Sequence, residues 1–411
     1  MHQLAIRSRL HMAETPQQER KIIHLDLDAF FCAVEELRDP NLRGKPFAVG
    51  GSPEGRGVVA TCSYAARKFG IHSAMAMAKA LRLCPQLIIV RHHFTDYTKL
   101  SDQVHNLIST YSPLVQPISI DEAFVDLTHL PDDGVFYAKQ LQAEIRSRFG
   151  LPVSLGVATN KLVAKVATNV GKAAHRADGY PNAIQVVPPG EEAAFLSPLP
   201  SDALWGVGPK TAERLAELGI YTVGDIAAFP ARELERHFGQ HGCDLHRRAQ
   251  GIDDSPVHTS HETKSVGQEE TFARDINDEE NLRAVIREQA ESVGRRLRHL
   301  ELYGGTVKLK LRWPDFTTIT RQSTLSKPTD DPKQIEELAV QLFIRNWKGR
   351  KIRLLGVGVS NLGPASQQLV LWDWNPRDAD KQERLQTAIA SLQARYGEAA
   401  LSKASKLKVK P

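Results

Sequence analysis

The sequence predicts a multidomain α+β protein, and three observations lead to this fold class. The chain has 411 residues, which is more than one hydrophobic core usually supports. Segments with alternating apolar and polar side chains, typical of strands, are interleaved with segments of helical spacing. The composition changes near residue 188 and again over 251–263, which indicates domain boundaries.

Composition excludes several classes of protein. No apolar stretch approaches the roughly 18 to 20 residues that span a bilayer, so no membrane partner is expected. The cysteines form no CxxC pair, which argues against a zinc site or a disulfide framework and favours a reducing cytoplasm. The net charge of +5 fits a polyanionic partner without demonstrating one. Residues 1–20 are interpreted as a loose leader, and Met12 is an alternative start to Met1.

The first predicted element is a strand over residues 21–31, KIIHLDLDAFF. In it Ile23, Leu25 and Leu27 alternate with His24, Asp26 and Asp28, so that one face is apolar and the other carries two carboxylates. A short helix over 32–40, strands over 47–51 and 57–64, and a helix from about 65 are expected next.

A mixed α/β unit follows along the chain. Residues 94–111 have helical spacing, and Pro113 ends the helix before a strand at 115–120, the doublet Asp121-Glu122 and a strand at 123–127. Two strands that meet at an acidic turn suggest a hairpin. A helix over about 135–149, a strand over 152–158 and a helix over 160–170 complete the unit. We expect its sheet to carry Asp26 and the acidic doublet on neighbouring strands.

The second half of the chain contains a helix, a glycine-rich turn and a helix within 204–220, and then a polar linker over 251–263. Beyond the linker, strand-like and helical segments predict an α+β sandwich; the strand-like segments are 270–276, 306–326 and 351–362, and the helices are 277–300 and 331–347.

The acidic residues point to metal chemistry. Carboxylates that cluster while ionised repel one another, so together they imply a cation. Mg²⁺ fits best because it prefers oxygen ligands and retains open positions, and two such ions suit nucleotidyl transfer. The alternative is that Asp121 caps a turn and Asp26 faces solvent on an edge strand. Spacing alone leaves both interpretations open.

Four strings then resemble the Y-family DNA polymerases, in order and approximate spacing, and within that family the bacterial polymerase IV group. They are HLDLDAFFCAVEE, VVATCSYAARKFGI, SIDEAFVDLT and GVATNKLVAKVAT. The resemblance implies a right-hand polymerase of low fidelity that acts in translesion synthesis and DNA repair. Its implied parts are a palm (21–30 and 94–182), small fingers (31–93), a helix-hairpin-helix thumb (183–252), a linker (253–263), a little finger (264–363) and a tail (364–411).

The same resemblance implies roles for individual residues. Two Mg²⁺ ions would be held by Asp26, Asp121, Glu122 and the backbone carbonyl of Leu27, with the three carboxylates catalytic. Asp28 is assigned to structural support. Phe31 takes the position of the steric gate against ribonucleotides, and its alternative is a core residue, as Phe30 is expected to be. The residues expected to hold the incoming deoxynucleoside triphosphate are Tyr64, Arg67 and Lys165, with Thr61 and Ser119 as lesser contacts.

Contacts to primer-template DNA are expected from two places. Gly206 and Gly208 would permit a tight turn whose N–H groups face a phosphate. Lys308, Lys310 and Arg312 alternate on one strand and so point the same way.

Beyond the last domain, the peptide Gln368-Leu369-Val370-Leu371-Trp372 resembles the sequence with which bacterial polymerases dock on the sliding clamp, although Trp372 departs from the usual phenylalanine. The alternative is a C-terminal strand on the little finger. We expect a monomer. The segment 171–187 departs from the shorter turn of the family, which puts the local path from palm to thumb in question.

Two rival functions remain at this stage. A nucleotidyl cyclase would share the palm-like sheet and acidic ligands but needs no DNA, and the helix-hairpin-helix and extra domain argue against it. A noncatalytic DNA-binding adaptor would have no reason to keep a buried acidic cluster.

Overall fold

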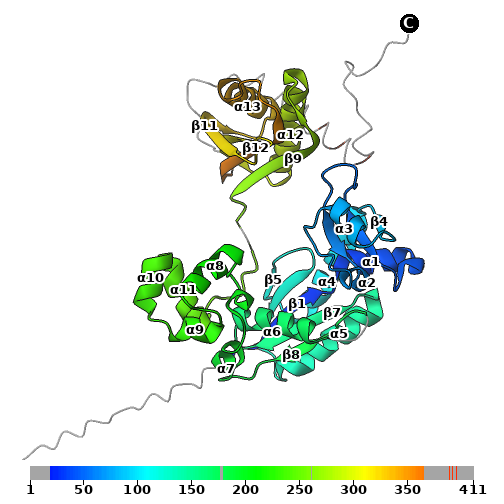
Figure 1. Cartoon of the computed structure of the whole chain (residues 1–411), viewed down its shortest axis with the longest axis vertical. Helices are drawn as coiled ribbons and strands as arrows, with labels where there is room; N and C mark the ends of the chain where they lie inside the picture. Colours follow the sequence, from blue (N-terminus) through cyan, green and yellow to red (C-terminus); the bar gives the residue numbers. More distant parts are fainter. Residues whose placement is uncertain are drawn as a thin grey trace, which may run out of the picture. The chain divides into compact units, whose positions relative to one another are not determined.

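The computed structural model describes residues 19–175, 179–260 and 262–364, together with the isolated positions 388, 391 and 395. The leader therefore lies almost entirely outside the described residues, as does the predicted clamp peptide at 368–372. The chain divides into two compact units (Figure 1), one formed by 1–262 with 272–274 and the other by 263–271 with 275–411. No helix among the described residues is long and apolar enough to cross a membrane.

The first unit is built on a five-stranded sheet with the order β5-β6-β1-β7-β8. Its strands are β1 (Ile22–Leu27), β5 (Val115–Pro117), β6 (Glu122–Asp126), β7 (Val153–Ala158) and β8 (Ile184–Val186). The central strand β1 is antiparallel to β6 and to β7. The predicted hairpin is confirmed, because β5 and β6 pair antiparallel.

Helices cover both faces of this sheet (Figure 1); they are α1 (Phe30–Arg38), α4 (Phe94–Tyr111), α5 (Gly134–Phe149) and α6 (Lys161–Ala174). Ile23, Leu25 and Leu27 of β1 join a core with residues of α1, α4 and α5. Ile22 belongs to a second core with α6. Gly156 allows α6 to lie close, because a Cβ there would stand 2.0 Å from the Ala164 carbonyl oxygen.

Burial on both faces corrects one interpretation left open by the sequence. All six residues of β1 are buried, and the strand is central, so Asp26 does not face solvent on an edge strand. The polar alternation of the strand therefore marks a second buried surface, which α6 covers.

A smaller three-stranded sheet, β3-β2-β4, forms the next part of the first unit. Its elements are β2 (Phe47–Gly50), β3 (Val59–Cys62), β4 (Ile88–Val90), α2 (Tyr64–Arg67), α3 (Met77–Leu83) and the 3-10 turn Pro40–Leu42. The strands expected at 47–51 and 57–64 are confirmed, whereas β4 has no counterpart among the predicted elements.

Helices make up the last part of the first unit (Figure 1); they are α7 (Glu192–Leu196), the 3-10 turn Ser201–Ala203, α8 (Pro209–Glu217), α9 (Val223–Ala228), α10 (Ala231–Phe238) and α11 (Gln240–Ala249). Gly206 has φ 102°, as a tight turn requires. Gly208 has φ −86° at the N-cap of α8, so its backbone conformation does not require glycine.

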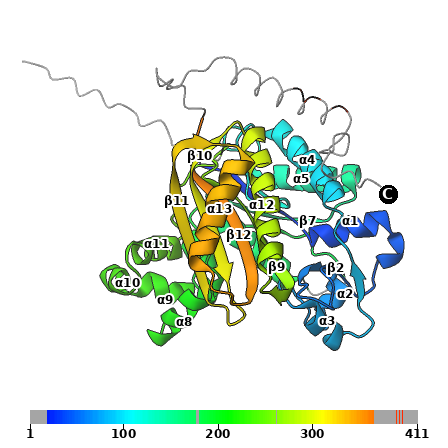
Figure 2. The same ribbon diagram turned by 90° about the horizontal axis from the view of Figure 1, so that it is seen from above.

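The second unit contains a four-stranded antiparallel sheet with the order β11-β10-β12-β9. Its elements are β9 (Ser265–Ile276), α12 (Glu279–His299), β10 (Tyr303–Arg312), β11 (Thr318–Thr329), α13 (Pro332–Asn346) and β12 (Ile352–Gly363). Figure 2 shows α12 and α13 on one face of this sheet. The two predicted helices are confirmed, and the sheet's other face carries the charged side chains of β10.

Candidate active site

Strand pairing brings the predicted catalytic carboxylates together. Asp26 lies directly opposite Glu122 in the β1–β6 register. The backbone N–H of Leu27 donates to the Asp121 carbonyl oxygen at 2.9 Å. The three carboxylates therefore come from adjacent positions at one end of two central strands. Asp26 is 9% exposed, so its charge is largely removed from water.

Two lysines of α6 lie against these carboxylates. Lys172 Nζ is 2.7 Å from Asp26 Oδ1, and Lys165 Nζ is 2.7 Å from Glu122 Oε2. Positions 165 and 172 are seven residues apart, which places both side chains on the same face of a helix. The Ser119 hydroxyl donates to Asp121 Oδ1 at 2.5 Å. Each predicted metal-binding carboxylate thus has a protein donor of its own.

Burial raises the pKa of Asp26 to about 7. The charges of Glu122 and Asp121 act in the same direction, while Lys172 opposes the shift by its charge and hydrogen bond. Burial also works to lower the pKa of Lys172, but the charges of Asp26 and Asp28 outweigh it and the pKa is raised. The pocket is therefore short of positive charge even with Lys172 in place.

His24 was not predicted as a site residue, but its Nε2 lies 4.0 Å from Glu122 Oε2. It is fully buried, its Nδ1 lies 2.8 Å from the Thr168 hydroxyl, and its Nε2 lies 3.3 Å from Lys165 Nζ. Burial lowers the pKa of His24 well below its usual value, and the nearby lysines lower it further. A neutral imidazole can accept a hydrogen bond from Lys165 and so help to hold this lysine beside Glu122.

The contacts of Asp28 fit the structural role that the sequence predicts for it. It is completely buried, and its carboxylate accepts from the Ser154 hydroxyl at 2.9 Å and from the Asn182 backbone N–H at 3.0 Å. Lys172 Nζ lies 3.2 Å away. With these partners, Asp28 ties β1 to β7 and to the segment before β8, and it stabilises the end of Lys172 that reaches Asp26.

The donor set suits a hard divalent cation, because it consists of carboxylates and a backbone carbonyl. Among the described residues, no three His, Cys, Asp or Glu side chains are gathered closely enough to hold a metal ion. The reason is visible in the contacts, since Asp26 and Glu122 turn to lysines and Asp121 turns to Ser119. The residue types and their register fit a metal, and binding requires these side chains to exchange ammonium and hydroxyl donors for the ion.

The predicted nucleotide-binding residues divide into two groups. Tyr64 and Arg67 lie on α2, with the Arg67 guanidinium 4.4 Å from the centre of the Tyr64 ring. Burial and the charge of Asp28 raise the pKa of Tyr64 to about 12, while Arg67 and Lys172 oppose the shift. Lys172 is therefore the lysine on the side of Tyr64. Lys165 lies instead beside Glu122, with its ammonium 5.8 Å from the centre of the Trp205 ring.

Phe31 lies on α1, three residues after Asp28, and is only partly buried. Its ring stacks on Tyr97 with centroids 4.3 Å apart and planes inclined by 14°. Phe30, by contrast, is 1% exposed and belongs to the core. Phe31 packs against the same core from its edge, so the two neighbouring phenylalanines differ in exposure.

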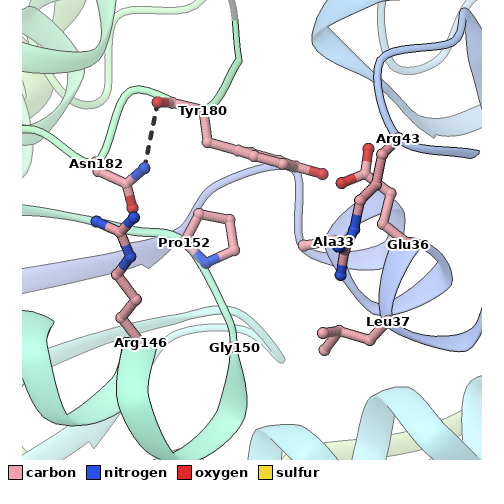
Figure 3. Close-up of a pocket in the computed structure, with 9 residues that line it drawn as sticks. All are labelled: Ala33, Glu36, Leu37, Arg43, Arg146, Gly150, Pro152, Tyr180 and Asn182. Carbon is pink, nitrogen blue, oxygen red and sulfur yellow. Dashed lines mark hydrogen bonds between the residues drawn. The ribbon is translucent and has the colours of Figure 1, made fainter. Parts of the chain in front are cut away.

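Figure 3 shows a cavity of about 210 Å³ in the first unit; it is lined by Ala33, Glu36, Leu37, Arg43, Arg146, Gly150, Pro152, Tyr180 and Asn182. Figure 3 shows the Tyr180 ring extending across it, with its hydroxyl toward Glu36 and Arg43. The cavity is smaller than the roughly 300 Å³ at which small-molecule pockets begin. The Tyr180 ring also contacts the Tyr64 ring edge-on, with centroids 5.5 Å apart, so a residue that lines this cavity packs against a predicted nucleotide-binding residue.

In the second unit, the alternation predicted for β10 is confirmed. Lys308, Lys310 and Arg312 are partly exposed, whereas the residues between them are buried. Lys310 Nζ pairs with Glu269 at 2.7 Å, and Arg312 Nε donates to the Thr318 hydroxyl at 2.8 Å. The three cations therefore lie on the sheet face opposite the helices, where they can meet a polyanion.

Comparison with known families matches most of the chain. The impB/mucB/samB family model matches residues 25–169, and the model of that family's C-terminal domain matches 263–370. Between them, the thumb domain of DNA polymerase-iota matches 202–253. Asp26, Asp121 and Glu122 fall within the first match.

Individual relatives extend the similarity. The chain is 41% identical over 349 residues to DNA polymerase IV of Listeria monocytogenes serovar 1/2a, covering 84% of this chain and 96% of that one. It is 41% identical over 352 residues to DNA polymerase IV of Streptococcus pyogenes serotype M5, with 84% and 94% covered.

Solved structures are similar as well. A Y-family DNA polymerase chimera of Dbh and Dpo4 has a TM-score of 0.74 at 28% identity, over 84% of this chain and 99% of the other. An insertion ternary complex of Dbh DNA polymerase has a TM-score of 0.60 at 27% identity, with 84% and 99% covered.

Proposed function

This chain belongs to the Y-family of DNA polymerases, in the DNA polymerase IV group, and we propose that Asp26, Asp121 and Glu122 carry its nucleotidyl transfer. It is a template-directed DNA polymerase that adds deoxynucleotides to a primer 3′ end in translesion synthesis. The observation that supports the residue assignment best is the register that sets Asp26 opposite Glu122 on two central strands.

The carboxylates and the Leu27 carbonyl are the groups that would hold divalent ions, and we propose Mg²⁺ as the physiological one. Such ions lower the pKa of a coordinated hydroxyl and stabilise charge on phosphoryl oxygens. In this chain, Lys172 and Lys165 partly neutralise Asp26 and Glu122. Asp28 and His24 hold those two lysines in place from behind.

The incoming deoxynucleoside triphosphate is proposed to meet Tyr64 and Arg67, since the guanidinium can grip phosphate oxygens and the phenol can donate one bond. Lys172 is added to this set because its ammonium lies 2.7 Å from Asp26 Oδ1 and its charge acts on the pKa of Tyr64. Lys165 remains a predicted contact, with a position nearer to Glu122 and hence to the other end of the carboxylate row.

Phe31 is proposed as the gate that excludes ribonucleotides. Phe31 lies in the first turn of α1, three residues after Asp28, is partly exposed, and has a ring that stacks on Tyr97. A fixed ring beneath the sugar leaves no room for a 2′-hydroxyl, so a ribonucleotide would clash with the ring where a deoxynucleotide fits.

Primer-template DNA is proposed to contact the turn at Gly206 and Gly208 and the cations Lys308, Lys310 and Arg312. Docking of Gln368, Leu369, Leu371 and Trp372 on a sliding clamp is proposed from the peptide sequence alone, and so is the monomeric state. A pull-down of the purified clamp by the wild type, but not by a chain that ends at residue 364, is the expected result for the peptide.

The catalytic assignment is tested by extension of a labelled primer with Mg²⁺ and each deoxynucleotide in turn. We expect template-matched addition by the wild type and none by Asp121→Ala/Glu122→Ala. The exposed pair Glu279→Ala/Glu280→Ala on α12 is the control for loss of two negative charges and should extend normally. Equal extension by both double variants would refute the assignment while leaving the polymerase activity itself in place.

A further inference from the structure

Beneath the proposed gate lies a buried carboxylate that the catalytic account does not use. Glu35 is 3% exposed and follows Phe31 by four residues, so both side chains point from the same face of α1. Glu35 Oε1 accepts from the Tyr97 hydroxyl at 2.5 Å and lies 2.8 Å from His93 Nδ1. Arg38 Nε is 3.4 Å from Oε2. One carboxylate therefore joins α1 to the first turn of α4.

Tyr97 connects this carboxylate to the gate. Its ring is fully buried and stacks on Phe31, while its hydroxyl is fixed by Glu35. Phe94, which is 57% exposed, meets Phe31 edge-on at 5.9 Å. The ring of Phe31 thus stacks on a tyrosine that the core packs and whose hydroxyl donates a short hydrogen bond to a buried carboxyl group.

We propose that Glu35 is a positioning residue for sugar selection, which it exerts by holding Tyr97, and through Tyr97 the ring of Phe31, at a fixed height beneath the incoming sugar. This inference rests on the proposed role of Phe31 as the gate. Without the hydrogen bond the Tyr97 side chain gains freedom to move, the Phe31 ring stacked on it can shift as well, and the space opposite a 2′-hydroxyl widens. Shape-based exclusion fails when its supporting side chain gains freedom of about an ångström.

The structure offers a matched control on the same helix. At the other end of α4, the Tyr111 hydroxyl donates to Glu144 Oε1 at 2.6 Å, and α4 is 18 residues long. Tyr111→Phe removes an equivalent tyrosine–glutamate hydrogen bond far from Phe31. Tyr97→Phe removes only the hydroxyl that reaches Glu35. Any general loosening of α4 should therefore affect both variants.

The experiment measures kcat and KM for single insertions of a deoxynucleotide and of the matching ribonucleotide. We expect the ratio of the two kcat/KM values to fall about tenfold in Tyr97→Phe, chiefly through improved ribonucleotide insertion. Glu35→Gln keeps an acceptor in a side chain of the same size and should retain most of the discrimination against ribonucleotides. Glu35→Ala should lower the ratio as much as Tyr97→Phe does. Tyr111→Phe should keep the wild-type ratio.

Phe31→Val is measured beside these variants to separate the gate role of Phe31 from the positioning role of Glu35. If Phe31→Val leaves the ratio unchanged, the gate assignment fails and this inference falls with it. If Phe31→Val admits ribonucleotides while Tyr97→Phe and Glu35→Ala do not, the gate stands and the positioning role of Glu35 is overturned. Equal changes in Tyr97→Phe and Tyr111→Phe would also overturn it.

Discussion

The palm sheet around β1 and the sheet of the second unit carry charge in opposite ways. In the first, Asp26 lies in the central strand β1 and Asp28 lies just beyond its end; both are buried, and Lys172 of the covering helix α6 pairs with both. In the second, Lys308, Lys310 and Arg312 lie on the sheet face opposite α12 and α13, where Glu269 pairs with Lys310. The same alternation of side chains along a strand therefore produces two different electrostatic environments.

Burial therefore determines how large an effect the loss of one charged side chain has. Burial raises the pKa of Asp26, and the loss of a buried carboxylate removes several interactions at once. An exposed cation is screened by water and salt, so its neighbours can share its role. We therefore expect large single effects at β1 and small, salt-dependent ones at β10.

The largest effect is expected from pH in metal-free protein. The folded pKa of Asp26, about 7, lies above its ordinary value of 3.8, so the folded state binds the extra proton between these values. The contribution of Asp26 to the free energy of unfolding should therefore be greatest below pH 4 and should fall by about 4 kcal/mol as the pH rises to 7. Urea unfolding in EDTA measures it.

Asp26→Asn is the control for that pH dependence, because it removes the titrating group with little change in shape. The difference in unfolding free energy between variant and wild type should move in favour of the variant as the pH rises from 4 to 7. A constant difference over this range would show that Asp26 titrates normally.

The next effect concerns Asp28. Asp28→Asn should lower the free energy of unfolding by about 3 kcal/mol, because the amide keeps one acceptor oxygen for the two positions that face the Asn182 N–H and Lys172, and Lys172 loses one of its two carboxylate charges. Urea unfolding at pH 7 checks this value. The isosteric Asp26→Asn should not be destabilised by a similar amount, and equal losses would mean that the two carboxylates have the same structural role.

A smaller effect distinguishes the two lysines of α6. Lys172→Met should weaken binding of the incoming nucleotide about 30-fold, the loss expected for one charge-assisted phosphate contact. Lys165→Met should act mainly on the rate of insertion, because Lys165 lies against Glu122. Single-turnover kinetics give both constants, and the reverse pattern would return the triphosphate contact to Lys165.

The smallest effect is expected on the open sheet. Lys308→Ala should raise the Kd for primer-template DNA about threefold at low salt and reduce the slope of log Kd against log salt by about 1. Lys310→Ala should do less, because Glu269 already pairs with Lys310. Lys333→Ala, an exposed lysine of α13, should leave Kd unchanged, and an equal effect there would exclude a specific role for this strand.

Much of the fold could be predicted from local pattern. The helix at 94–111 was predicted with the bounds of α4, because its apolar spacing is regular and Pro113 follows. The strand β4 was missed, since three residues give too short a pattern to recognise. Gly208 was expected to need a glycine-only conformation, but a spacing of Gly-x-Gly does not reveal φ.

The candidate site was predictable where a single strand carries the signal, as at Asp26 and Asp28. Lys172 and His24 were missed for a physical reason. The predicted helix ended at 170, whereas α6 continues to Ala174 and brings Lys172 over Asp26. The partnership of Glu35 with Tyr97 joins residues 62 positions apart and depends on how α1 packs against α4, which no local pattern contains.

The central claim is that Asp26 serves chemistry whereas Asp28, two residues away, serves structure. The most direct test is single-turnover insertion of one correct deoxynucleotide at saturating Mg²⁺ by the two isosteric variants, Asp26→Asn and Asp28→Asn, at a temperature where both are folded. We predict a fall of about 10³-fold in the insertion rate for Asp26→Asn and of less than about tenfold for Asp28→Asn. Equal losses, or a larger loss for Asp28→Asn, would contradict the account.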